Sequence, residues 1–174
     1  PASLWYIEPV NEFELTIDGF AAVCMPFAMT LPEGVVAYTA GTSVEVEGTV
    51  VAPLTEYSGA VVAAGVPVIL AAENGTYAIG VGGEAAAFEG ENRLAGVLKS
   101  KNVSGSNVYT LNNGEFVKRT ASSGTVAANT AYYTSDSEAA SIVLHKGKVT
   151  SIGSIVAGDG QLKIYDLKGN RVEK

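Results

Sequence analysis

The chain has 174 residues, a formal net charge of −7 and 47% hydrophobic residues, so it carries enough apolar material for one folded domain. One histidine and one cysteine exclude an intrachain disulfide framework and a Cys/His zinc cluster, and the acidic balance excludes a nucleic-acid binder of the usual basic kind. The longest apolar run, residues 60–72, is broken by Gly65 and Pro67 and is too short to cross a bilayer, so we expect no membrane insertion.

The charge is divided unevenly along the chain. Residues 1–91 contain twelve acidic residues and no lysine or arginine, whereas residues 92–174 contain all 11 basic residues and six acidic ones. The basic residues are scattered and follow no nucleic-acid-binding motif. The asymmetry therefore indicates either two halves of one domain that pack together or head-to-tail contact between molecules.

Residues 1–10 are treated as the remnant of a preceding domain or a linker. They hold the only tryptophan, Trp5, followed by Tyr6, and Pro9 then restricts the backbone. The two rings are expected to pack on this domain or a preceding one, and the alternative is an aromatic platform for stacking on sugars.

The remainder of the chain predicts short strands and no helices. No segment keeps apolar residues at helical spacing with caps at both ends, while 20 glycines and many Thr, Val and Tyr residues favour strands and turns. The expected strands are residues 13–17, 20–25, 44–47, 67–70, 76–81, 108–111, 115–118, 131–134, 141–145 and 162–165.

Turn residues predict how some of these strands connect. Asp18-Gly19 indicates a tight turn after the first strand, because glycine tolerates the positive φ that such turns need. The segments Glu73-Asn74-Gly75 and Asn112-Asn113-Gly114 each predict a hairpin between their flanking strands.

One internal repeat is visible. Residues 62–68 (VAAGVPV) align with residues 126–132 (VAANTAY), a shift of 64 residues. Gly65 and Asn129 occupy the same position, and both residue types tolerate left-handed backbone. The repeat predicts two pseudo-equivalent sharp turns that each start a buried strand of the same domain. Chance similarity of Ala/Val-rich segments is the alternative.

These elements predict an all-β fold. The expected architecture is a two-sheet antiparallel β-sandwich of about ten to twelve short strands over residues 11–160, with a β-barrel as the alternative. Residues 161–174 are expected to form the final strand, at an edge, and the start of a further segment.

The residues with reactive side chains predict no catalytic site. His145 stands at a strand end without a nucleophile motif, and Cys24 lies in an apolar strand where nothing would lower its pKa. Glu45 and Glu47 share one strand face, as glycosidase carboxylates could, but any solvated strand shows the same spacing. We therefore expect that the chain is not an enzyme and has no resident cofactor.

Two binding hypotheses stay open. The first is a structural calcium ion held by carboxylates of two polar loops, for which the candidates are Glu84, Glu89, Glu91 and Asp136. The second is a sugar-binding surface of exposed rings, for which the candidates are Trp5, Tyr6, Tyr57, Tyr132 and Tyr133. Because Tyr132 and Tyr133 are consecutive, a strand would place one ring on each face.

Four segments resemble a known type of module. Residues 26–38 (PFAMTLPEGVVAY), 62–70 (VAAGVPVIL) and 124–133 (GTVAANTAYY) are similar to successive landmarks of a C-terminal β-rich accessory module. Such modules occur in large secreted and cell-surface proteins of gut and oral anaerobic bacteria. Residues 164–172 (IYDLKGNRV) resemble the opening of a C-terminal sorting segment of the type IX secretion kind.

The resemblance implies an extracellular or cell-surface location and a role beside other domains of the same chain. It implies a non-catalytic structural or accessory module of an exported multidomain surface protein, with no catalytic residues to transfer. The alternative is a carbohydrate-binding or adhesin module that uses exposed aromatic residues. The expected partners are other domains of the chain or a glycan, and neither nucleic acid nor a membrane interior.

Overall fold

In a computed structural model the chain is all-β, as the sequence predicts. The structure describes residues 9–103, 105–119, 124–147 and 149, together with the backbone of two short strands near the C-terminus. These residues contain eighteen strands and no helix. The strands are β1 (Glu12–Ile17), β2 (Phe20–Val23), β3 (Met29–Thr30), β4 (Val36–Ala40), β5 (Val44–Val46), β6 (Thr49–Glu56), β7 (Val61–Val62), β8 (Val68–Ala71), β9 (Gly75–Val81), β10 (Leu94–Val97), β11 (Lys101–Asn102), β12 (Val108–Asn112), β13 (Glu115–Lys118), β14 (Thr125–Val126), β15 (Thr130–Thr134), β16 (Ser141–Lys146), β17 (Ile164–Tyr165) and β18 (Arg171–Val172).

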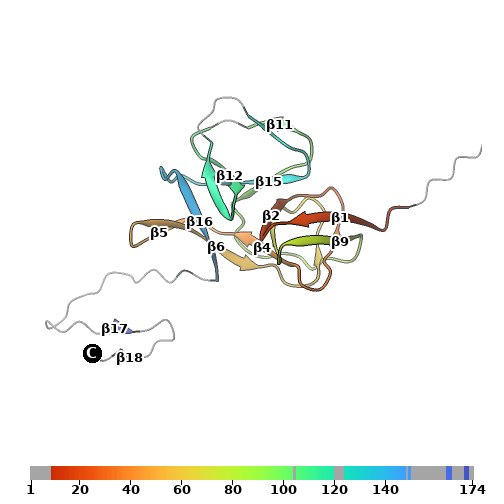
Figure 1. The fold of residues 1–174 in the computed structure, drawn as a ribbon, viewed down its shortest axis with the longest axis horizontal. Helices are drawn as coiled ribbons and strands as arrows, with labels where there is room; N and C mark the ends of the chain where they lie inside the picture. Colours follow the sequence, from red (N-terminus) through yellow and green to blue (C-terminus); the bar gives the residue numbers. More distant parts are fainter. Residues whose placement is uncertain are drawn as a thin grey trace, which may run out of the picture.

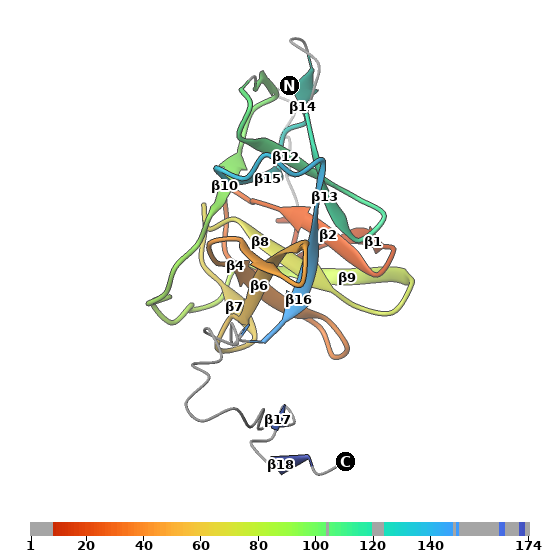
Figure 2. The same cartoon turned by 90° about the vertical axis from the view of Figure 1, so that its left-hand side faces the viewer.

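The larger sheet closes on itself (Figure 1, Figure 2). Its strand order is β15-β12-β13-β16-β6-β4-β8-β2, and β2 returns to β15 through the pair Val23 and Thr130. The Cys24 N–H donates to the carbonyl oxygen of Asn129 at 3.2 Å beside this pair. The result is an eight-stranded barrel. Two further strands pair with its members, β10 with β15 and β5 with β6.

The barrel was the alternative architecture, and the expected two-sheet sandwich is not confirmed. Alternation of apolar residues identifies strands but not their partners, and two unexpected pairings close this sheet. One is the β15–β2 bridge, and the other is the insertion of β16 parallel to β6, with Val143 opposite Val51. The described residues form eighteen strands, more than the ten to twelve expected, and six of the eighteen are only two residues long.

A separate four-stranded sheet, in the order β1-β9-β3-β7, packs against the outside of the barrel. Strand β8 shows why two layers meet there, since all four of its residues are buried. Val68 and Leu70 belong to the cluster shared with the small sheet, while Ile69 points to the cluster inside the barrel. A strand buried on both faces lies between two cores.

The turn predictions have mixed outcomes. Asn113 and Gly114 have φ values of 48° and 80°, and β12 pairs with β13 in register Asn112 to Glu115, so this hairpin is confirmed. The hairpin expected at residues 73–75 is wrong. There β8 pairs with β2 and β4 of the barrel, whereas β9 pairs with β1 and β3 of the small sheet. The turn carries the chain from one sheet to the other.

The two turns of the internal repeat are confirmed. Gly65 has φ 74° and Asn129 has φ 60°, and each precedes a strand with buried residues, β8 and β15 respectively. Both strands pair antiparallel with β2, one on each side. The pseudo-equivalent segments therefore flank the same strand of one barrel.

The predicted ends of the module lie largely outside the described residues. This applies to residues 1–8 and to most of residues 150–174, so the boundaries at residues 10 and 160 stay predictions. At the C-terminus β17 pairs antiparallel with β18, in register Ile164 to Val172.

Candidate functional site

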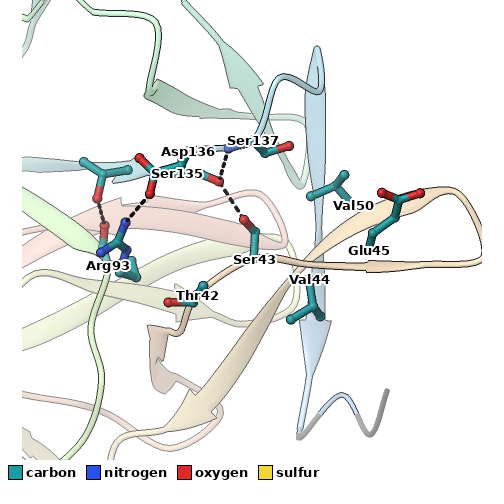
Figure 3. Close-up of a pocket in the computed structure, with 10 residues that line it drawn as sticks. Thr42, Ser43, Val44, Glu45, Val50, Arg93, Ser135, Asp136 and Ser137 are labelled. Atoms are coloured by element: carbon teal, nitrogen blue, oxygen red, sulfur yellow. Dashed lines mark hydrogen bonds and ion pairs between the residues drawn. The ribbon is translucent and has the colours of Figure 1, made fainter. Parts of the chain in front are cut away.

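A polar hollow of about 260 Å³ lies where three segments of the barrel meet (Figure 3). The first segment runs from the β4–β5 connection through β5 to the start of β6, the second precedes β10, and the third is the end of β15 with the loop that follows it. Hydroxyl side chains dominate the lining: Thr42, Ser43, Thr134, Ser135 and Ser137. Glu45, Arg93 and Asp136 supply charge, and Val44 and Val50 supply an apolar wall.

The β15 strand fixes one side of this hollow. Its alternating burial places Tyr133 inside the barrel and leaves Thr134 at the surface end. The Thr134 N–H donates to the carbonyl oxygen of Arg93 at 3.0 Å, and the Thr134 hydroxyl donates to the same oxygen at 2.9 Å. The backbone at Arg93 is thereby held against the end of β15.

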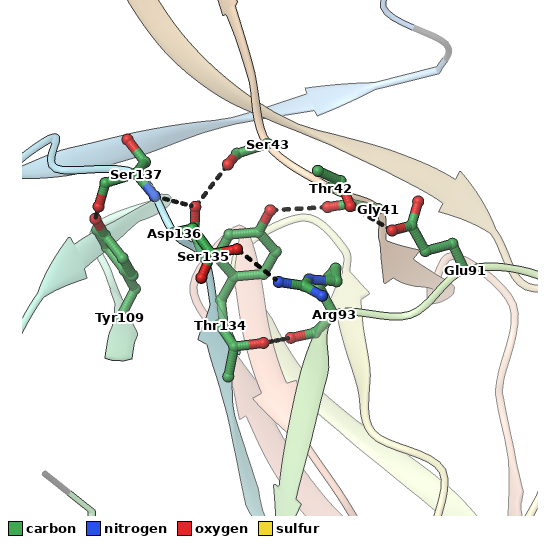
Figure 4. Close-up of polar contacts among 11 residues, drawn as sticks. Gly41, Thr42, Ser43, Glu91, Arg93, Tyr109, Thr134, Ser135, Asp136 and Ser137 are labelled. Atoms are coloured by element: carbon green, nitrogen blue, oxygen red, sulfur yellow. Dashed lines mark hydrogen bonds and ion pairs between the residues drawn. The ribbon is translucent and has the colours of Figure 1, made fainter. Parts of the chain in front are cut away.

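Hydroxyl groups tie the three segments together (Figure 4). Ser43 Oγ and Ser135 Oγ are 2.6 Å apart, which joins the β4–β5 connection to the loop after β15. The Tyr133 hydroxyl donates to the carbonyl oxygen of Gly41 at 2.8 Å from inside the barrel. The Thr42 hydroxyl donates to the Glu91 carboxylate on a third segment.

The loop after β15 is also held by a tyrosine from the interior of the barrel. The Tyr109 hydroxyl lies 2.6 Å from the carbonyl oxygen of Ser137 and 3.0 Å from that of Ala139. Within the loop, the Ser137 N–H donates to Ser135 Oγ at 3.1 Å, and the Ala139 N–H donates to Ser137 Oγ at 3.1 Å. Side-chain acceptors of this kind stabilise turns that lack a sheet ladder.

Two side chains near the hollow, Tyr133 and Glu91, have shifted pKa values. Burial raises the pKa of the Tyr133 hydroxyl, so that group stays a proton donor to Gly41 at neutral pH. The hydrogen bond from Thr42 holds the pKa of the Glu91 carboxyl below its usual range, and Arg93 acts in the same direction. Glu91 is therefore an anion at neutral pH.

Arg93 is the least satisfied polar group of the hollow. Its side chain is 37% exposed, but the Nε atom is buried and has no hydrogen-bond partner among the described residues. Its Nη2 lies 3.8 Å from Asp136 Oδ2, on a side chain that is 93% exposed. By contrast, Lys118 Nζ lies 3.0 Å from Glu138 Oε2 on the same loop. The Arg93–Asp136 pair is thus open and the Lys118–Glu138 pair is closed.

The aromatic candidates occupy different places from those expected. Tyr133 is fully buried and stacks on Phe116, with ring centroids 4.6 Å apart. Tyr57 is also buried, stacks on Phe88 at 5.3 Å, and donates its hydroxyl to the carbonyl oxygen of Ala86 at 3.2 Å. The expectation that these two rings are exposed is therefore corrected, because each is a core ring whose hydroxyl finds a backbone partner.

The other aromatic candidates are Tyr132, Trp5 and Tyr6. Tyr132 is half-buried and packs against a small valine cluster formed by Val97, Val103, Val108 and Val126. The consecutive tyrosines do lie on opposite faces of β15, as expected. Trp5 and Tyr6 lie outside the described residues.

The calcium candidates do not form one cluster. Glu84 and Glu89 are exposed on the connection between β9 and β10, whereas Glu91 and Asp136 lie on either side of Arg93. No group of three or more His, Cys, Asp or Glu side chains that could hold a metal ion occurs within the described part of the chain.

Sequence reasoning singled out Asp136 and Glu91 but missed Arg93, Thr42 and Ser43. One signal for Arg93 was present, because it is the first basic residue after an entirely acidic half of the chain. The contribution of Thr42 and Ser43 could not be found, since residues 49 and 92 positions away in sequence complete their hydrogen bonds.

The two reactive side chains lie in different parts of the barrel. His145 is exposed on β16, opposite Pro53 of β6. Cys24 is buried directly after β2, and burial raises the pKa of its thiol. Neither residue lines the polar hollow.

A second hollow, of about 450 Å³, lies between β2, β12 and β15, where the pairing of β2 with β15 is limited to one residue pair. Its lining is mixed, with apolar side chains such as Phe20 and Leu111 beside the charged Asp18 and Arg119. Charged and hydroxyl side chains make up eight of the ten residues that line the first hollow and five of the fifteen that line the second, so the first hollow is the candidate site.

No protein-family model, curated protein or solved structure matches the chain. Among the described residues, no helix is long and apolar enough to span a bilayer.

Proposed function

We propose that this chain is a non-catalytic accessory module of an exported, multidomain surface protein, in which it acts as a structural joint beside other domains. The observation that carries the proposal is the use made of polar side chains at the end of the barrel. The Ser43–Ser135, Tyr133–Gly41 and Thr42–Glu91 contacts each join two segments of the chain that are far apart in sequence.

Such cross-links suit a mechanical role. The hydroxyls satisfy one another and the loop backbone, so they hold the connections in one arrangement. A module that transmits position between neighbouring domains needs rigid connections at its ends. The sequence motifs at residues 26–38 and 164–172 support export and a place near the C-terminus of a longer chain.

The proposal is tested in the complete parent protein. Deletion of residues 11–160 should leave the intrinsic activity or binding of upstream domains intact but reduce their display on the cell surface, measured by antibody labelling of intact cells. A matched deletion of an upstream domain should leave display of this module intact. Normal display without the module would contradict the proposal.

The alternative is a carbohydrate-binding or adhesin module. Of the aromatic candidates within the described residues only Tyr132 retains partial exposure, so stacking on rings has limited support. The open Arg93–Asp136 pair favours a polar mode of binding instead. A glycan array probed with and without calcium tests the alternative, with Tyr132→Ala as the variant for the stacking mode.

A further inference from the structure

The open ion pair in the polar hollow leaves hydrogen-bonding capacity unused. A separation of 3.8 Å between Arg93 Nη2 and Asp136 Oδ2 exceeds hydrogen-bond distance. The buried Nε atom of Arg93 also lacks an acceptor among the described residues. Because Nε is buried, a ligand in the hollow cannot reach it. The groups open to a ligand are the end of the 37% exposed Arg93 side chain and the 93% exposed Asp136 carboxylate.

The charges around Arg93 restrict what that ligand can be. Two carboxylates, Glu91 and Asp136, lie near the Arg93 guanidinium, and Glu91 is held in its ionised form, while Glu45 adds a third negative charge on the far wall of the hollow. A small anion would face an excess of negative charge. A metal ion would face the Arg93 guanidinium between two of the carboxylates. An uncharged ligand with both donors and acceptors avoids both conflicts.

The remaining walls specify the shape of such a ligand. Figure 3 shows Arg93 and Asp136 on one side of the hollow and Val44 and Val50 on the other, with Ser43 between them. Hydroxyls line the polar side, and the two valines offer an apolar surface for C–H groups. A pyranose ring has hydroxyls at its edge and C–H groups on its faces, and a volume of about 260 Å³ suits a single ring rather than a larger ligand.

We infer that this hollow binds one uncharged sugar residue, one of whose hydroxyls accepts a hydrogen bond from Arg93 and donates one to Asp136. A hydroxyl group can accept and donate at once, so one hydroxyl would bridge Arg93 Nη2 and Asp136 Oδ2 across their separation of 3.8 Å. The inference deepens the carbohydrate-binding alternative and moves its site from aromatic rings to the polar hollow. It does not depend on the accessory role, which the display experiment tests separately.

The test is an NMR titration of the full chain with the methyl glycosides of glucose, galactose and mannose. The Nε–Hε signal of Arg93 reports on the environment of the guanidinium whose Nη2 faces Asp136. At least one glycoside should shift this signal with a saturable, weak affinity, as expected for a small ligand in an open site. Glucuronate and calcium chloride, added separately, should shift it less.

Two matched variants assign the binding. Asp136→Asn removes the charged acceptor at nearly constant shape and should weaken binding by about tenfold, the loss expected for one charge-assisted hydrogen bond. Glu138→Gln, two residues away on the same loop, breaks the closed pair with Lys118 and should leave affinity unchanged. Thermal unfolding of both variants verifies that each is folded.

Several results would overturn the inference. They are an Arg93 signal unmoved by all three glycosides, stronger binding of glucuronate or calcium, or equal affinities for the wild type and Asp136→Asn. Equal losses in Asp136→Asn and Glu138→Gln would likewise assign the effect to the loop as a whole and not to the open pair.

Discussion

The two large buried clusters of this molecule are built from different residues and relate differently to the candidate site. The cluster inside the barrel contains Tyr109, Phe116 and Tyr133, and two of these rings send hydroxyls to the loops of the polar hollow. The cluster between the barrel and the small sheet is mainly aliphatic, with residues such as Ile17 and Ile79.

This difference has a functional consequence. Packing in the barrel cluster is continuous with the hollow, because Phe116 stacks on Tyr133 and Tyr133 bonds to Gly41. The aliphatic cluster lies on the other face of β8 and shares no hydrogen bond with the hollow among the described residues. Mutations in the two clusters should therefore be similar in stability cost and different in their effect on the site.

The largest expected effect comes from Phe116→Ala compared with Ile79→Ala. Both side chains are fully buried. Removing them should lower the free energy of unfolding by about 3–5 and about 2–5 kcal/mol respectively, because each leaves a cavity. Urea unfolding measures both losses, and only Phe116→Ala should also shift the NMR signals of Gly41 and Ser43.

The comparison fails if Ile79→Ala moves the signals of Gly41 and Ser43 as strongly as Phe116→Ala does. That result would mean that the clusters behave as one unit. Ile79→Val serves as the control, with an expected loss of about 0.5–1.5 kcal/mol and the same undisturbed hollow.

The next effect tests the junction where β10 lies over Cys24. A Cβ atom on Gly96 would overlap Cys24 Sγ and would lie 3.0 Å from Cys24 Cβ. Gly96→Ala should therefore cost about 1–3 kcal/mol through overpacking. In a Cys24→Ala background the same change should cost less, because the sulfur is gone, and a double-mutant cycle of urea midpoints measures the difference. Additive costs would contradict the overlap.

Sequence reasoning succeeded where the determinants are local. The Asn113-Gly114 turn and the left-handed turns at Gly65 and Asn129 depend on the residue at one position, and all three were predictable. The alternation along β15 likewise separated Tyr132 from Tyr133.

The failures share one physical origin, which is pairing between distant segments. Residues 73–75 have the composition of a hairpin turn, but the strands on either side of them pair in two different sheets. The barrel closes through Thr130 and Val23, 107 positions apart, and no local pattern encodes that bridge. The hollow was missed for the same reason, since its side chains come from three separate segments.

A smaller effect separates the two buried tyrosines that the sequence offered as exposed rings. Tyr133→Phe and Tyr57→Phe each remove a hydroxyl bonded to a backbone carbonyl, and each should cost about 0.5–1.5 kcal/mol. Only Tyr133→Phe should loosen the β4–β5 connection, seen as faster amide hydrogen exchange at Thr42 and Ser43. Unchanged exchange there would show that the Ser43–Ser135 contact alone holds the connection.

The smallest expected effect is a pH dependence at the rim of the hollow. The Thr42 hydrogen bond lowers the pKa of Glu91 in the folded chain, with Arg93 acting in the same direction, so folding favours the ionised carboxylate. The stabilisation is present above the unfolded glutamate pKa, about 4.3, and is lost as the pH falls through the lower folded pKa. Because Glu91 is largely exposed, solvent screening limits the contribution to roughly 0.2–1 kcal/mol.

Unfolding curves of the wild type and Glu91→Gln should therefore converge as the pH falls through this window. The matched control is Glu89→Gln, at an exposed position two residues earlier. A difference between wild type and Glu91→Gln that grows on acidification would show that the carboxylate is not stabilised in the folded state.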